Sequence, residues 1–238
     1  MAGVYLLEFK SYQAGIVKTC AGGMYRIRWR YEWRRRVLKS LEARALQVRD
    51  IGPLDFAVAA GECVCLSGAS GAGKSLLLRA LADMEPHLGR VSLDGVACDG
   101  IAPTQWRRNV ALLTAESAWW HDRVGEHFSR VDDLLLAELG FEKRVMSAEV
   151  HSLSTGERQR LALLRLLAGR PRVLLLDEPT ASLDPLNTER VERLLTLYRE
   201  EQDAGVLWVS HDPLQVRRVA HRHWRLADGR LHEEILST

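Results

Sequence analysis

The residues Gly68–Ser75, GASGAGKS, place three glycines, a lysine and a hydroxyl residue at the spacing G-x-x-x-x-G-K-[ST]. This pattern predicts a loop whose backbone N–H groups wrap around phosphate oxygens, because glycine lets the backbone approach an anion closely. Lys74 would bring a mobile positive charge to the terminal phosphates, and Ser75 a hydroxyl ligand for Mg²⁺. The residues expected to line the bound phosphates are Gly68, Ala69, Ser70, Gly71, Ala72, Gly73, Lys74, Ser75 and Leu76.

A second candidate group is acidic. In RVLLLDEPT, Arg172–Thr180, a run of apolar residues ends in Asp177 and Glu178. The run predicts a buried strand that delivers both carboxylates to the edge where ligands bind in open α/β sheets. Asp177 suits a Mg²⁺ shell, directly or through water, and Glu178 is placed to polarise an attacking water. Such a strand is a weak signal alone, but a strong one about 100 residues after the phosphate loop.

Buried strands and helices alternate along the chain and would position these groups. The alternation predicts an α/β fold with a mostly parallel sheet flanked by helices. Strands are expected at 55–58, 62–66, 91–93, 110–113, 172–176 and 205–210, the last as the final buried strand of the main sheet. Helices are expected at 74–83, 161–167 and 188–201, with helical spacing over 124–150.

A third motif, HSLSTGERQR (His151–Arg160), lies between the first two. Its core LSTGE, Leu153–Glu157, resembles the LSGGQ signature of the ATP-binding cassette (ABC) ATPases. In that family two cassettes meet head to tail, and the signature of one closes on the γ-phosphate held by the other. The resemblance therefore implies nucleotide-binding roles for Ser154, Gly156 and Glu157, with an anion at a helix start. A plain helix cap would give the same letters, so the order and spacing of the motifs favour the resemblance.

Two further stretches agree with this family. ASLDP, Ala181–Pro185, resembles the loop that carries signals across the dimer interface, with Asp184 at its acidic position. His211, in WVSHDP, matches the family's switch histidine, which contacts the γ-phosphate. The resemblance spans residues 41–238. It implies a P-loop NTPase fold with an antiparallel β portion and a short helical subdomain at about 116–168.

Some positions depart from the family pattern. The glutamine that touches Mg²⁺ and the attacking water is absent, since its position is Ala115. Glu116, one residue later, either replaces it in part as a Mg²⁺ ligand or is a solvated loop residue. Trp119 and Trp120 follow, where the family receives a cytoplasmic helix of the membrane subunit. They either anchor such a helix, as large aromatics do, or pack between the two subdomains.

Residues 1–40 differ in composition from the rest of the chain, since they hold nine Lys and Arg residues but only two Glu. The remainder is mildly acidic, which argues against nucleic-acid binding across its whole face. Aromatic and basic residues alternate from Tyr25 to Arg34 and predict a strand. A peripheral strand or loose extension, a later translation start, and an arm that binds anionic lipid or RNA all stay open. Tyr31 or Trp33 would stack the adenine only if this segment folded back.

Composition limits the remaining classes of protein. The chain has 238 residues and a net charge of +2, and its apolar runs are far shorter than the roughly 18–20 residues of a membrane span. The N-terminus shows no secretory pattern, so we expect a cytosolic location. Cys63 and Cys65 alternate along an expected strand and read as small buried residues.

The family resemblance implies the ATP-hydrolysing subunit of an ABC transporter, with ATP and Mg²⁺ as cofactors. Its partners would be a second ABC subunit, in the simplest case a homodimer, and an integral membrane permease, with the protein peripheral on the inner face of the cell membrane. GERQR and VLWVSHD resemble small bacterial exporter ATPases. No nucleic-acid partner is expected. Two alternatives remain: a soluble ABC ATPase acting on nucleic acid or ribosomes, and a weakly hydrolysing, nucleotide-gated assembly module.

Overall fold

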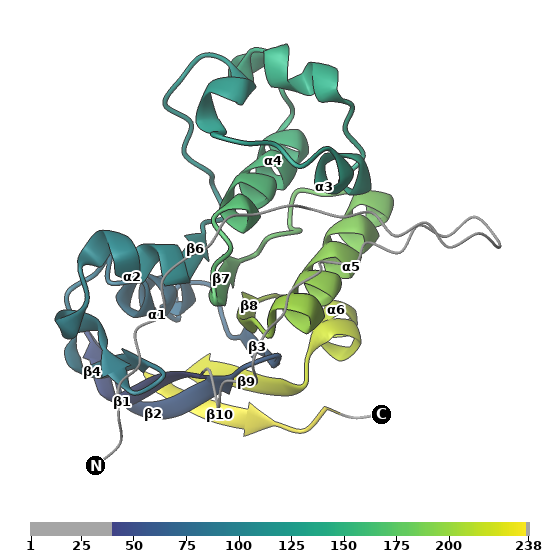
Figure 1. Ribbon diagram of the computed structural model, residues 1–238. Coiled ribbons are helices and arrows are strands. Elements are labelled where there is room, and N and C mark those ends of the chain that lie inside the picture. Colours follow the sequence, from purple (N-terminus) through teal and green to yellow (C-terminus); the bar gives the residue numbers. More distant parts are fainter. Residues whose placement is uncertain (1–39, 237–238) are drawn as a thin grey trace. The chain divides into compact units, whose positions relative to one another are not determined.

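Strands rich in buried apolar residues form the central sheet. The computed structural model describes residues 40–236. Its six-stranded sheet has the order β10-β9-β3-β8-β7-β6, and all neighbours pair in parallel except β10 with β9. The strands are β3 (Cys63–Ser67), β6 (Val110–Leu113), β7 (Val173–Asp177), β8 (Gly205–Val209), β9 (Arg222–Ala227) and β10 (Arg230–Glu234). Parallel pairing brings the carboxyl ends of β3, β6, β7 and β8 to one edge (Figure 1).

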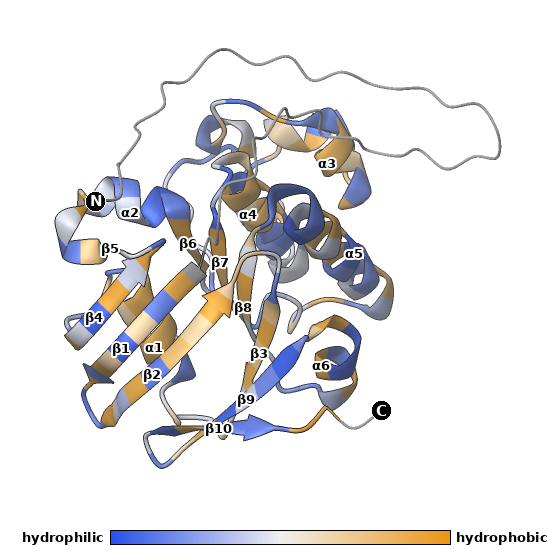
Figure 2. Cartoon of the chain, turned by 60° about the horizontal axis from the view of Figure 1, so that its bottom comes forward, coloured by the Kyte–Doolittle hydropathy of each residue, from blue (hydrophilic) through white to orange (hydrophobic). Residues whose placement is uncertain are grey.

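A second, antiparallel sheet has the order β2-β1-β4-β5. Hydrophobic and hydrophilic residues alternate along β1 and β4 (Figure 2), as expected when one face of a sheet packs on a core. This sheet is the antiparallel β portion that the family resemblance implied. Its strands are β1 (Ser40–Val48), β2 (Ile51–Ala59), β4 (Leu88–Leu93) and β5 (Val96–Ala97).

Helix α1 (Lys74–Leu81) packs between the two sheets, against β1 on one side and β7 on the other. Its apolar residues Leu77 and Leu78 are fully buried. Trp106 of α2 (Pro103–Asn109) is also buried, and its indole Nε1 donates to the carbonyl of Leu81, 3.0 Å away. The helices α4 (Thr155–Ala168), α5 (Pro185–Gln202) and α6 (Pro213–Val219) lie on the other side of the central sheet (Figure 1).

The helical region, residues 116–168, is less helical than its sequence pattern predicted. Over 124–150 the only α-helix is α3 (Asp133–Glu138), which Asp132 caps by accepting from the N–H of Leu134 at 2.9 Å. The chain then turns, because the N–H of Phe141 bonds back to the carbonyl of Leu136 at 3.0 Å. The rest forms single 3₁₀ turns at Val124–His127, Lys143–Ser147 and Val150–Ser152. A fourth such turn, Cys98–Gly100, lies outside this region.

Strand β8, expected as the final buried strand of the main sheet, is the last strand buried along its whole length, but two further strands of this sheet, β9 and β10, were not predicted. Strand β9 follows it in sequence and pairs with β3 on the side away from β8. Polar residues alternate with Trp224 and Leu226 along β9, so it lacks the continuous apolar run that marks the other buried strands. Strands β2 and β3, which overlap the expected strands 55–58 and 62–66, follow one another in sequence but belong to different sheets.

Other expectations concern burial and location. Cys63 and Cys65 are buried, as their alternation predicted. Within residues 40–236, no helix combines the length and the apolar character needed to cross a bilayer. The expectations for residues 1–39, including the strand from Tyr25 and the adenine contacts of Tyr31 or Trp33, lie outside the described residues.

Candidate nucleotide-binding site

The phosphate loop joins β3 to α1 at the carboxyl edge of the central sheet. A Cβ on Gly68 would overlap the backbone carbonyl of Leu226 in β9, and the φ of Gly68 is +146°. Glycine is therefore required where the loop leaves β3. The side chain of Lys74 reaches back to the start of the loop, where its Nζ donates to the carbonyls of Gly68 at 2.8 Å and Ala69 at 2.9 Å. This holds the ammonium group in place at the start of α1.

The charge of Lys74 is balanced by two carboxylates. The lysine is 7% exposed, and burial lowers the pKa of its ammonium group. The negative charges of Glu178 and Asp177 oppose this and raise that pKa. Asp177 is itself buried at the end of β7. The basic and acidic motifs, about 100 residues apart in sequence, therefore act on one another in the fold, as their placement at one sheet edge predicted.

The acidic loop after β7 is bonded to the loop after β8. The N–H of Glu178 donates to the carbonyl of Val209 at 3.2 Å. His211 Nε2 lies 2.8 Å from Glu178 Oε1. Glu178 has a φ of +50°, a left-handed conformation that costs about 1–3 kcal/mol for a non-glycine residue and that clusters at active sites. We call the loops 68–74, 177–181 and 210–212 together the phosphate edge.

The signature residues lie at the start of α4. Ser154 and Glu157 form a capping box: Ser154 Oγ donates to Glu157 Oε2 at 2.7 Å, and the N–H of Ser154 donates to the same oxygen at 2.8 Å. These two bonds lower the pKa of the Glu157 carboxyl. Gly156 has no room for a side chain, since a Cβ there would lie 2.9 Å from the carbonyl oxygen of Ser182. The start of α4 thus packs on the loop that leads to Asp184.

Asp184 caps the next helix. Its Oδ1 accepts from the N–H of Asn187 at 2.9 Å, which with the bond from the Asn187 amide lowers the pKa of its exposed carboxyl. The structure therefore gives both Asp184 and Ser154 a capping role. The helix-cap interpretation of the signature is correct as a description of this chain alone, and it leaves the Ser154 side chain exposed.

Glu116 lies in the loop that follows β6. Its backbone carbonyl accepts from Thr114 Oγ1 at 2.6 Å, while its side chain is exposed. Because Leu113 pairs with Leu176 in the sheet, this loop begins beside the strand that ends in Asp177. Glu116, Asp177 and Ser75 offer carboxylate and hydroxyl oxygens, the donors that Mg²⁺ prefers. The donor set at this edge fits that ion.

Sequence reasoning missed the side chains that hold the Glu116 loop. Gln159 of α4 is 4% exposed. Its Oε1 accepts from Ser117 Oγ at 2.9 Å, and its Nε2 donates to the carbonyl of Thr114 at 3.2 Å. Arg165 donates to the carbonyl of Ala118 at 2.9 Å. In sequence these partners are 42 to 47 residues apart, so no local pattern marks them.

The two tryptophans of this loop have different environments. Trp119 is half-buried, and its ring packs on His127 with ring centres 4.8 Å apart. Trp120 is 63% exposed. The Arg165 guanidinium lies 4.7 Å from the ring centres of both tryptophans. His127 Nε2 accepts from the N–H groups of Trp120 at 3.0 Å and His121 at 3.1 Å. These contacts of Trp119 are within the helical region and not between the two subdomains, and most of the Trp120 side chain is exposed.

The sequence of this chain is similar to those of known proteins. Residues 51–181 match the model of the ABC transporter family. Protein STAR1 of Oryza sativa subsp. japonica is 36% identical over 197 residues, 76% of this chain and 56% of STAR1. The chain thus spans little more than half of that relative. The probable iron export ATP-binding protein FetA of Escherichia coli (strain K12) is 31% identical over 172 residues, 67% of this chain and 76% of FetA.

A solved structure shows the same fold. It is the dimeric post-hydrolysis state of the ATP-binding cassette MJ0796 bound to ADP and Pi, with a TM-score of 0.73 and 23% identity. The match covers 83% of this chain and 99% of MJ0796. The predicted P-loop NTPase fold, with a mostly parallel sheet and an antiparallel portion, is confirmed. Together with the matched family model, these likenesses establish that the chain belongs to the ABC transporter family, as one of its ATP-binding cassettes.

Proposed function

We propose that the protein binds Mg–ATP at the phosphate edge and hydrolyses it to drive a separate membrane permease. The observation that carries this proposal is the 2.8 Å contact between His211 and Glu178, on loops whose carboxylates act on Lys74. A cation, a general base and a histidine at one sheet edge are the groups that phosphoryl transfer to water requires.

In this mechanism the side chains of the phosphate edge bind the phosphates, activate water and hold Mg²⁺. Lys74 and the N–H groups of residues 68–75 hold the β and γ phosphates and offset their charge. Glu178 orients a water molecule and accepts its proton, while His211 contacts the γ-phosphate and holds Glu178 in place. Ser75 and Asp177, with Glu116 beside them, would hold Mg²⁺, which when bound neutralises charge that develops on the phosphate oxygens.

The proposal includes a second copy of the chain. Ser154 is exposed at the start of α4, a helix of 14 residues whose N-terminus attracts anions. Ser154 and Gly156 of one copy would contact the γ-phosphate held by Lys74 of the other. Asp184 would lie at the interface between the copies. Glu157 would act through Ser154: the hydroxyl proton that bonds to Glu157 at 2.7 Å in the single chain would turn to the γ-phosphate when the copies meet.

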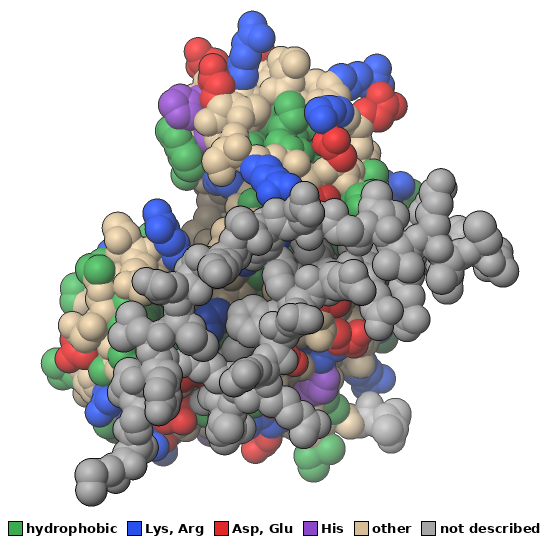
Figure 3. All heavy atoms as spheres, viewed as in Figure 1, with side chains coloured by type: hydrophobic (Ala, Val, Ile, Leu, Met, Phe, Trp, Pro, Cys, Tyr) green, Lys and Arg blue, Asp and Glu red, His purple; other side chains and the backbone are tan. Residues whose placement is uncertain are grey.

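The membrane permease would dock on the helical region. The exposed Trp120 suits a docking anchor, since a large aromatic buries much area at a low cost in side-chain entropy. Lys, Arg, Asp and Glu side chains are interspersed over this region in the view of Figure 3. The protein would lie on the cytoplasmic face of the membrane, with a domain from about residue 41 onward and a helical subdomain at about 116–168.

The test compares Glu178→Gln with the wild-type protein. The variant should lose ATP hydrolysis by about 10²-fold or more, as when a general base is removed, while it still binds Mg–ATP by equilibrium dialysis. It should also dimerise with Mg–ATP in light scattering, because trapped nucleotide joins the copies. Glu189→Gln, an exposed residue of α5, is the matched control and should hydrolyse ATP normally. A Glu178→Gln variant that keeps full turnover, or stays monomeric with bound nucleotide, contradicts the proposal.

The role of Glu116 has a separate test. If its carboxylate is a Mg²⁺ ligand, Glu116→Ala raises the Mg²⁺ concentration needed for half-maximal hydrolysis. Glu126→Ala changes another carboxylate of the helical region, one that accepts from the N–H of Arg123 at 3.3 Å, and serves as the control. Unchanged Mg²⁺ dependence and rate in Glu116→Ala would leave Glu116 as a solvated loop residue.

A further inference from the structure

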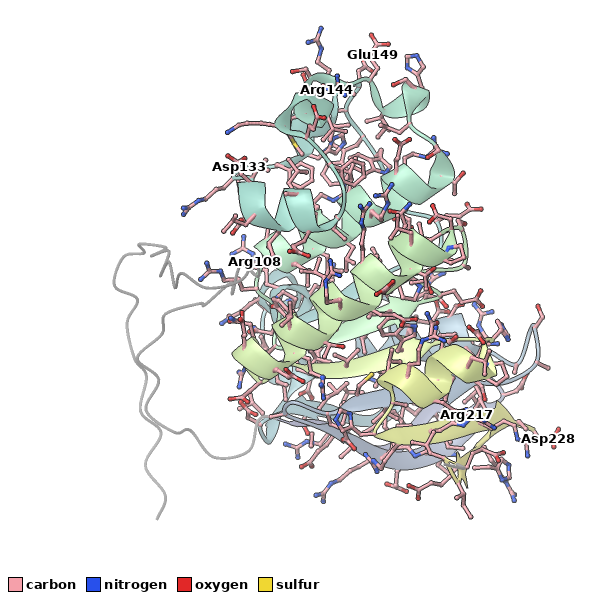
Figure 4. The ribbon with its side chains drawn as sticks, turned by 90° about the vertical axis from the view of Figure 1, so that its right-hand side faces the viewer. Arg108, Asp133, Arg144, Glu149, Arg217 and Asp228 are labelled. Atoms are coloured by element: carbon pink, nitrogen blue, oxygen red, sulfur yellow. The ribbon has the colours of Figure 1, made fainter. Side chains whose placement is uncertain are left out.

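Gln215 is a buried polar residue next to the phosphate edge. It lies on α6 and is 3% exposed, whereas Arg217, two residues further along the same helix, points outward (Figure 4). Burying an amide costs free energy unless its hydrogen bonds are made. Its Oε1 accepts from Ser210 Oγ at 2.8 Å. Its Nε2 donates to Thr180 Oγ1 at 2.9 Å and to Glu192 Oε1 at 2.8 Å.

The orientation of this amide is fixed by Glu192 on α5. Arg218 donates to the Glu192 carboxylate through two N–H groups, at 3.0 and 2.8 Å, in a bidentate pair. An ionised carboxylate only accepts hydrogen bonds, so the NH₂ group of Gln215 must face Glu192. The amide oxygen is thereby turned toward Ser210.

The remaining partners of Gln215 flank the two residues that we assign to catalysis. Ser210 directly precedes His211, and its Oγ accepts from the N–H of Asp212 at 3.1 Å. The Ser210 hydroxyl thus links the residue before His211 to the residue after it. Thr180 stands two residues after Glu178. Gln215 therefore bonds both loops whose tips carry the pair at 2.8 Å.

We propose that Gln215 is a positioning residue that holds Glu178 and His211 in register for hydrolysis. The inference rests on the proposed function. The backbone bond from Glu178 to Val209 joins the two loops at their base, and Gln215 adds a second link through Ser210 and Thr180. Glu192 and Arg218 complete the support by fixing the direction of the amide.

The variant Gln215→Glu isolates this role because it keeps the shape of the side chain. Its carboxylate accepts from Ser210 Oγ and from Thr180 Oγ1, which lies 3.3 Å from Gln215 Oε1, but it loses the donor to Glu192 and places a second negative charge against that residue. We expect kcat for ATP to fall about 10- to 100-fold, as for a small misplacement of catalytic groups. The KM for ATP should stay unchanged, because Lys74 and the phosphate loop lie outside this set of bonds.

The double variant Glu192→Gln/Gln215→Glu provides the rescue. The amide now at position 192 donates to the carboxylate at position 215, which restores the bond with its direction reversed. We expect kcat to return to within a few-fold of the Glu192→Gln single variant. Tyr198→Phe removes another buried hydrogen bond, from the Tyr198 hydroxyl to the carbonyl of Pro171 at 2.8 Å. It is the control for general destabilisation and should leave kcat unchanged.

A second readout does not depend on hydrolysis. The NMR shifts of the His211 ring, assigned with His211→Ala, should move in Gln215→Glu and return in the double variant at the same pH. Unmoved shifts with wild-type kcat in Gln215→Glu would overturn the positioning role, and so would a kcat that falls without rescue. Wild-type protein that hydrolyses no ATP, but whose His211 shifts respond as described, would contradict the proposed function and leave the role of Gln215 intact.

Discussion

The phosphate edge and the helical region are held together by different kinds of bond. At the phosphate edge, loops continue directly from strands that pair residue by residue, and backbone groups such as the N–H of Glu178 make the cross-links. In the helical region long regular elements are few, and single side chains make the cross-links instead. Gln159, Arg165 and His127 each bond to backbone groups of the loop that carries Trp119 and Trp120, or of the adjoining residues.

This difference shows how each region responds to change. Bonds between backbone groups survive most side-chain substitutions, so the phosphate edge is sensitive mainly where a glycine, a charged group or the buried amide of Gln215 is required. The helical region also relies on buried cations: Arg160 donates to the carbonyl of Leu139 and lies over the Phe141 ring. Burial lowers the pKa of both Arg160 and Arg165. Loss of either side chain removes both a donor to a backbone carbonyl, that of Leu139 or of Ala118, and a contact with an aromatic ring.

The largest effect is expected from Lys74→Ala at the phosphate edge. The variant removes the charge that the Gly68 and Ala69 carbonyls hold in place, so ATP hydrolysis should fall about 10²- to 10³-fold. Steady-state phosphate release measures this. Lys143→Ala removes an exposed lysine of the helical region, paired with Asp133 at 2.9 Å, and should hydrolyse ATP normally. Similar losses in the two variants would show that activity depends on net charge and not on this position.

A pair of glycines tests the claim that the phosphate edge depends on its backbone. Gly68→Ala forces a Cβ against the Leu226 carbonyl, and we expect a loss of about 2–3 kcal/mol in the free energy of unfolding. At Gly71 the φ is +78°, but no atom lies within 4 Å of the position of a new Cβ. The variant Gly71→Ala should therefore lose only about 1 kcal/mol in the free energy of unfolding. Urea unfolding measures both. Equal losses would mean that steric contact with β9 does not determine where the loop leaves β3.

The same contrast explains what the sequence could predict. Lys74, Asp177, Glu178 and His211 follow buried apolar strands, and strand ends in a parallel sheet meet at one edge, so local patterns were enough to place them together. The partners of Gln159 are 42 and 45 residues away in sequence, and those of Gln215 are 5, 23 and 35 residues away. An isolated glutamine in a helix gives no signal for such contacts. The helical spacing over 124–150 misled for a similar reason, since the stretch holds one short helix, capped by Asp132, between separate 3₁₀ turns.

Arg165→Met tests the side-chain support of the helical region. The variant keeps an apolar stem but loses the bond to Ala118 and the contact with the two tryptophan rings. We expect a loss of about 1–2 kcal/mol in the free energy of unfolding. Amide exchange should rise over residues 116–128 and stay constant in β7. Arg193→Gln, which removes an ion pair with Glu138 on the surface, should cost less than about 0.5 kcal/mol. Faster exchange in β7 would show that the two regions do not respond separately.

The smallest effect is expected where the two regions meet, at the start of α4. Hydrogen bonds from Ser154 lower the pKa of Glu157 below its ordinary value of 4.5. A carboxyl whose pKa is lower in the folded state stabilises the fold above its unfolded pKa, and this contribution is lost as the pH falls through the folded pKa. Ser154→Ala should therefore cost about 1 kcal/mol near pH 7 and less once the pH falls below the lowered pKa of Glu157, where the carboxyl is protonated in both proteins.

Urea unfolding of both proteins at a series of pH values from 7 to about 3 measures this difference. Part of the cost should remain in acid, because Ser154 Oγ accepts from the N–H of Glu157 at 3.3 Å whatever the charge of the carboxyl. Ser152→Ala is the control, since its hydroxyl donates to the carbonyl of Glu149 at 2.7 Å and not to a carboxylate. Its cost should not change with pH. If the cost of Ser154→Ala is equally constant, the capping box holds α4 by geometry alone, and the start of this helix then resembles the backbone-bonded phosphate edge.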